Sequence, residues 1–63
     1  MLNRVNKNNK PQIIKYMVNR FNQISKKNDS KLSIIDIWDV QLEVEQKFNI
    51  SDYQVEKLTS ELL

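Results

Sequence analysis

The sequence predicts an all-α fold in which three helices form one small bundle. Apolar residues recur at three- and four-residue steps in three separate segments, which is the period of a helix face. Helix-capping residues separate these segments, and the chain has one proline and no glycine. With 63 residues, no cysteine and no histidine, it has room for a single small core and lacks the usual disulfide or zinc reinforcement.

The first helix is expected over residues 10–28, after a flexible basic arm at residues 1–9 that lies outside the three-helix domain of residues 10–63. Pro11 suits the first turn, where a missing N–H costs nothing. Asn28 is expected to end the helix in a left-handed conformation, because the chain has no glycine for that position. The expected buried face is Ile13, Ile14, Met17, Val18, Phe21 and Ile24, with Lys15 and Arg20 on the solvent side.

The second helix is expected over residues 34–48, because Ser33 and Asp36 have the spacing of a capping box. At 100° per residue, its apolar residues fall into two bands. One band is Ile37, Val40, Val44 and Phe48, and the other is Ile35, Trp38 and Leu42. The acidic residues Asp36, Asp39 and Glu43 define an opposite ridge that is expected to face solvent.

Two polar residues, Gln41 and Glu45, lie between the two apolar bands. An unpaired carboxylate is costly to bury, so Glu45 must be solvated, paired or protonated. In one interpretation it reaches solvent beside a Lys or Arg of its own chain. In the other, the polar pair marks a seam between the core and a protein interface, which would consist of Ile35, Trp38, Gln41, Leu42 and Glu45.

The third helix is expected over residues 52–62, because Ser51 and Gln54 form a second possible capping box. Asn49 is expected to adopt a positive φ in the preceding turn, and Ile50 to enter the core. The segment from the second to the third helix resembles the helix-turn-helix family, and more loosely the winged-helix regulators. The residues that carry the resemblance are Val44, Phe48, Asn49, Ile50, Ser51, Val55 and Leu58.

This resemblance implies a corner between two packed helices and, as a function, DNA binding. The family has a small residue, usually alanine, at the position of Glu45. Residues 41–63 also carry a net charge of −3, which repels the phosphate backbone. If the chain binds DNA, Tyr53, Gln54 and Lys57 would enter the groove, and Arg4, Lys7, Lys10 and Lys15 would contact phosphates.

The charge distribution favours a binding protein, with residues 1–31 at +7 and residues 32–63 at −5. No arrangement of catalytic or metal-ligating residues is present, so we expect no enzyme activity, cofactor, metal or small-molecule substrate. No segment has the composition of a secretory signal or membrane span, which predicts a cytoplasmic protein. Size and composition suggest a regulatory protein that contacts a protein partner or forms a homodimer, such as a phage or mobile-element inhibitor or anti-repressor. DNA binding is the alternative.

Overall fold

In the computed structural model, which describes residues 2–63, the chain forms three α-helices and no strand within that range. The helices are α1 (Lys10–Lys27), α2 (Ile34–Phe48) and α3 (Asp52–Leu62). Their number and type confirm the predicted all-α three-helix fold. Every observed boundary lies within one residue of the boundary expected from the sequence.

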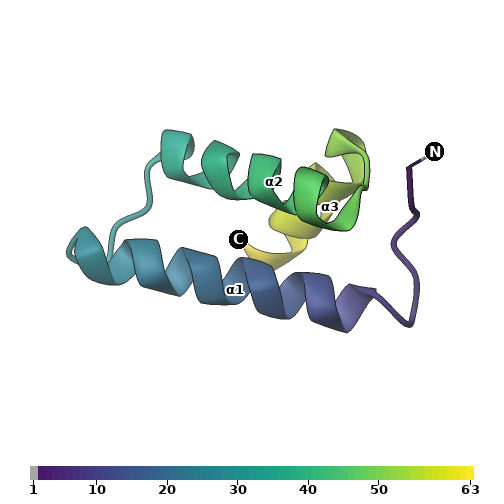
Figure 1. Cartoon of the computed structure of the whole chain (residues 1–63). Helices are drawn as coiled ribbons and strands as arrows, with labels where there is room; N and C mark the ends of the chain where they lie inside the picture. Colours follow the sequence, from purple (N-terminus) through teal and green to yellow (C-terminus); the bar gives the residue numbers. More distant parts are fainter. Residues whose placement is uncertain (1) are drawn as a thin grey trace.

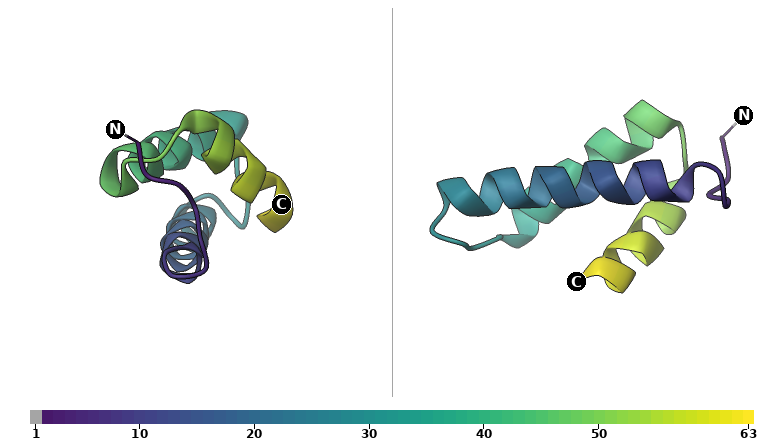
Figure 2. Two further views of the ribbon diagram at one scale, coloured as in Figure 1. Left: turned by 90° about the vertical axis from the view of Figure 1, so that its right-hand side faces the viewer. Right: turned by 90° about the horizontal axis from the view of Figure 1, so that it is seen from below.

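The central helix is α2, because it packs against both α1 and α3. Figure 1 shows α1 and α2 running antiparallel and side by side, with α3 behind them. In the end-on view of Figure 2, the three helices occupy the corners of a triangle, with α1 below the other two. One face of α2 therefore closes the core, and the opposite face points away from both neighbours.

The core draws on all three helices and on the turn between α2 and α3. Its buried apolar residues are Ile13, Met17, Phe21, Val40, Val44, Ile50, Val55 and Leu58. Ile50 lies in the core as predicted, since only 2% of it is exposed. The predicted face of α1 is correct except at Val18, which is 37% exposed and lines a depression together with Leu62 and Leu63.

The caps of α2 match the predicted backbone chemistry. The Ser33 hydroxyl accepts a hydrogen bond from the Asp36 N–H at 3.1 Å, and the Asp36 carboxylate accepts one from the Ser33 N–H at 3.1 Å. This reciprocal pair is the expected capping box. At the other end, Asn49 has φ 53° and ψ 53°, the left-handed conformation that asparagine tolerates better than most residues.

The end of α1 differs from the prediction. Asn28 has φ −114°, and the positive φ values fall one and two residues later, at Asp29 (54°) and Ser30 (65°). The Asn28 N–H instead bonds to the carbonyls of Ile24 and Ser25, at 3.1 and 3.2 Å. The left-handed stop was therefore expected too early, because the last turn of the helix tightens before the chain reverses.

The acidic ridge expected on α2 is wrong at Glu43, whose carboxylate faces α1. It accepts hydrogen bonds from Arg20 Nε at 2.8 Å, Arg20 Nη2 at 2.9 Å and the Tyr16 hydroxyl at 2.7 Å. The Tyr16 ring meets the Phe48 ring edge-on, with centroids 5.8 Å apart. Arg20 was likewise expected in solvent, but it links the two helices through a two-pronged guanidinium–carboxylate pair.

These contacts shift the pKa values of the Glu43 and Tyr16 side chains. The hydrogen bond from Arg20 lowers the pKa of Glu43, and the Tyr16 hydroxyl adds to this effect, although burial opposes it. The Tyr16 pKa is raised, chiefly because the phenol must keep its proton to donate to Glu43. Both shifts stabilise the folded chain at neutral pH, where the carboxyl group is ionised and the phenol is protonated.

The arm, which the sequence predicts to be flexible, makes specific contacts with the corner between α2 and α3. The Asn3 N–H donates to the Asn49 carbonyl at 2.6 Å, and the Asn3 side-chain amide donates to the Phe48 carbonyl at 2.9 Å. The Val5 N–H donates to Gln54 Oε1 at 3.0 Å. In Figures 1 and 2 the arm rises from the start of α1 beside this corner.

Asparagine side chains shape the junction between the arm and α1. Asn6 Oδ1 accepts hydrogen bonds from the N–H groups of Asn8 and Asn9, at 2.8 and 3.0 Å. The Asn9 side chain accepts from the Asn6 N–H at 2.7 Å and donates to the Arg4 carbonyl at 2.9 Å. Such local side-chain bonds to the backbone are typical of turns, and here they direct the arm away from the helix axis.

Only one of the two hydrogen bonds of the capping box predicted from Ser51 and Gln54 forms at the start of α3. The Ser51 hydroxyl accepts from the Gln54 N–H at 3.4 Å, as expected. The Gln54 side chain, however, binds the Val5 N–H instead of returning to the cap residue. The side-chain oxygen of Gln54, which the sequence pattern assigned to the cap of α3, thus accepts a hydrogen bond from the arm.

Candidate functional site

The outward face of α2 carries a row of large apolar side chains, which we call the outer stripe. It consists of Ile34, Ile35, Trp38 and Leu42, which are 60%, 63%, 58% and 53% exposed. On the opposite face of the same helix, Val40 and Val44 are completely buried. The four residues recur at three- and four-residue steps and therefore form one continuous surface on successive turns.

The polar residue Gln41 lies at the edge of α2 that faces α3. Its side-chain amide donates to the Thr59 hydroxyl at 3.0 Å, and that hydroxyl donates to the Val55 carbonyl at 2.8 Å. Thr59 is 8% exposed, so the bond satisfies a polar group inside the contact between α2 and α3. Gln41 therefore serves the contact between these helices and lies beside the outer stripe rather than within it.

Two acidic residues, Glu45 and Asp39, border the outer stripe. Glu45 is half-buried and Asp39 is exposed. At about 100° per residue they lie on opposite sides of the row formed by Trp38 and Leu42. Neither makes an ion pair with any residue between positions 2 and 63, where the ion pairs are Arg20–Glu43 and Lys10–Glu61. Glu45 therefore has no ion pair within that range to support the interpretation in which it reaches solvent beside a Lys or Arg of its own chain.

No base lies on the outward face of α2. The only base of this helix, Lys47, points toward α1, with its ammonium group 5.3 Å from the centre of the Tyr16 ring. The outer stripe is therefore an apolar surface with negative charge on both sides. Ile34 and Asp39 were not among the interface residues predicted from sequence, although Ile34 lies four residues before Trp38, the spacing that would have included it.

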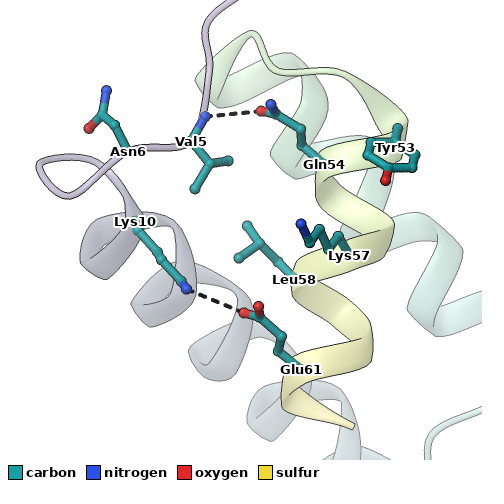
Figure 3. Close-up of a pocket in the computed structure, with 8 residues that line it drawn as sticks. All are labelled: Val5, Asn6, Lys10, Tyr53, Gln54, Lys57, Leu58 and Glu61. Carbon is teal, nitrogen blue, oxygen red and sulfur yellow. Dashed lines mark hydrogen bonds and ion pairs between the residues drawn. The ribbon is translucent and has the colours of Figure 1, made fainter.

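Residues proposed from sequence to contact DNA meet at a second location, between the arm and α3 (Figure 3). A hollow of about 250 Å³ lies there. It is lined by Val5, Asn6, Lys10, Tyr53, Gln54, Lys57, Leu58 and Glu61. Four of these were predicted as nucleic-acid contacts, and they come from the start of α1 and from the exposed side of α3.

The hollow is only weakly basic. The Lys10 ammonium group forms an ion pair with Glu61 at 3.4 Å, and the Gln54 carbonyl oxygen is bonded to the arm. Lys57 therefore remains as the base in the hollow without an ion pair to residues 2–63, and Tyr53 is 69% exposed at its rim. The neighbouring acids on α3 reduce its attraction for phosphate.

The other bases proposed to contact phosphates do not join this hollow. Arg4 and Lys7 are exposed on the arm, and neither lines it. Lys15 lies on α1 beside a separate shallow depression that also includes Lys47. The seven predicted nucleic-acid residues thus fall into three groups rather than one continuous basic surface.

Comparison of the chain with family models, curated proteins and solved structures gives no significant match. Within residues 2–63, no helix has the length and apolar composition needed to cross a membrane. The candidate functional sites are therefore the two surfaces described above, the outer stripe and the hollow beside the arm.

Proposed function

We propose that this chain is a small non-enzymatic regulatory protein that acts through protein–protein contact, with the outer stripe of α2 as its binding surface. The exposure of Trp38 supports the proposal most directly. An indole that is 58% exposed, between an exposed Ile35 and an exposed Leu42, leaves a large apolar surface in water. Tryptophan is also enriched among the residues that dominate binding energy at protein interfaces.

The fold supplies no reason of its own to place these side chains on the surface. Every helix already contributes buried residues to a core that includes Val40 and Val44 from α2. Replacing the outer stripe with polar residues would leave those contacts intact, and it would improve solubility. Retaining four large apolar residues there fits a surface that another protein, or a second copy of the chain, covers.

A variant that truncates the indole tests this proposal. We expect Trp38→Ala to weaken partner binding or self-association by at least about tenfold, because it removes the largest apolar group of the surface. The assay is capture from nuclease-treated host lysate with wild-type and variant chains, together with sedimentation of each. Circular dichroism should show equal helix content, since Trp38 is not part of the core.

Tyr53→Ala is the matched control, because it removes an exposed aromatic side chain from α3 instead. It should retain the same captured protein, or the same self-association, as wild type. If wild type sediments as a monomer and the protein that it captures is retained equally by Trp38→Ala, the proposal is wrong.

The second candidate function is DNA binding, and the convergence of Lys10, Tyr53 and Lys57 around one hollow favours it. In this case α3 would approach the duplex with the arm beside it. We expect a gel shift of duplex DNA at about 50 mM salt that weakens steeply at higher salt, because phosphate contacts release counterions. Lys57→Ala should reduce the shift, and the absence of any shift at low ionic strength would exclude this function.

A further inference from the structure

We infer that the partner of the outer stripe is a basic amphipathic helix from another protein, rather than a second copy of this chain. This inference rests on the proposed function and specifies the chemistry of the partner. It follows from the two acids beside the stripe, Asp39 and Glu45, and from the lack of a base on the outward face of α2.

The apolar part of the surface fits a helical partner. Ile34, Trp38 and Leu42 are spaced four residues apart on the outward face of α2, with Ile35 beside them. A row of this kind presents ridges and grooves into which the side chains of a second helix can pack. The partner helix must therefore carry its own apolar residues at three- and four-residue steps.

The acids define the charge of the partner. Asp39 and Glu45 lie on the two sides of the stripe, and neither has an ion pair within residues 2–63. A partner that packs along the stripe brings its flanking residues close to both carboxylates. Lysine or arginine at those flanking positions would pair with them, whereas glutamate or aspartate would be repelled.

The same charges oppose pairing between two copies. In a twofold-symmetric contact through this face, each copy presents the same surface to the other. The acidic edges of both stripes would then border one interface, and α2 offers no base on either edge, because Lys47 lies against Tyr16. Self-association would bring the carboxylates of the two copies near one another. A partner helix with basic flanking residues would instead form ion pairs with them.

Two synthetic peptides test this inference directly. Both would be end-capped helices without tryptophan that share one leucine stripe, with lysine at the flanking positions of one and glutamate at those of the other. Trp38 is the only tryptophan of the chain, so its emission reports contact with the outer stripe. We expect the lysine peptide to shift this emission to shorter wavelength and to bind about tenfold more tightly than the glutamate peptide.

Matched charge variants separate local pairing from general attraction. Asp39→Asn combined with Glu45→Gln should remove most of the preference for the lysine peptide. Asp52→Asn combined with Glu56→Gln changes the net charge equally at exposed positions of α3 and should preserve it. Equal affinity for both peptides, or an equal loss in the two double variants, would overturn the inference.

Other outcomes distinguish this inference from the proposed function. If sedimentation without peptide shows a dimer that Trp38→Ala abolishes, the occupant is a second copy: the inference fails, and the proposed protein contact stands. If neither peptide moves the emission, the chain is monomeric, and Trp38→Ala retains every captured protein, both fail. A preference for the lysine peptide that calorimetry finds unchanged in Trp38→Ala also overturns the inference, because binding then lies elsewhere.

Discussion

Ile50→Ala should lower the free energy of unfolding by about 3 kcal/mol, whereas Ile35→Ala should change it by no more than about 0.5 kcal/mol. The two substitutions remove the same atoms from different surroundings. Ile50 is 2% exposed within the turn that joins α2 to α3, and Ile35 is 63% exposed on the outer stripe. Removing the Ile50 side chain leaves a cavity beside side chains of both helices. The small core has few other contacts to compensate for the lost packing.

Thermal unfolding followed by circular dichroism measures both effects. For a chain of this size, the loss at Ile50 corresponds to a fall in Tm of about 20 °C. The two variants should rank in the opposite order for peptide affinity. Ile35→Ala should weaken binding of the lysine peptide more than Ile50→Ala does, because Ile35 is part of the outer stripe. Equal destabilisation by the two variants would show that the outer stripe supports the fold, and it would contradict its assignment as a binding surface.

Glu43→Ala should destabilise the chain by about 2 kcal/mol at pH 7, because it removes the acceptor of both Arg20 hydrogen bonds and of the Tyr16 hydroxyl. These groups are partly exposed, which keeps the effect below that of a fully buried pair. The loss should depend on pH. Folding lowers the pKa of Glu43 from its ordinary value of 4.5, so the unfolded chain binds the proton more tightly.

The contribution of Glu43 is therefore complete above about pH 4.5 and is lost as the pH falls through the lower pKa of the folded chain. The Tm difference between wild type and Glu43→Ala should be constant from neutral pH to that value and then shrink on acidification. Glu56→Ala serves as the control, because this exposed acid has no ion pair within residues 2–63. A difference that stays constant to pH 2 would show that the charge of Glu43 does not stabilise the fold.

Local sequence patterns were sufficient to predict the three helices and most of their ends. The capping box of Ser33, the positive φ of Asn49 and the burial of Ile50 each depend on residues within one turn of the chain. The separation of α2 into a buried band and an exposed band also follows from helical periodicity. The sequence pattern alone therefore predicts Trp38 and Leu42 as interface residues.

Contacts between segments far apart in the sequence could not be predicted in this way. Glu43 was placed on the solvent side because the angular projection of a single helix does not show where a neighbouring helix lies. Its pairing with Arg20 spans 23 positions and depends on how α1 crosses α2. Gln54 was assigned to a local cap for the same reason, although its side chain binds Val5 across 49 positions.

The attachment of the arm also bears on the order of folding. Most contacts of this chain join residues that are close in the sequence, a topology that forms on short timescales. Asn3 and Val5, by contrast, bond to residues 45 and 49 positions away, and closing a segment of that length costs conformational entropy. Their partners exist only after the corner between α2 and α3 has formed. Asn3 and Val5 are therefore expected to be among the last residues to reach their native positions.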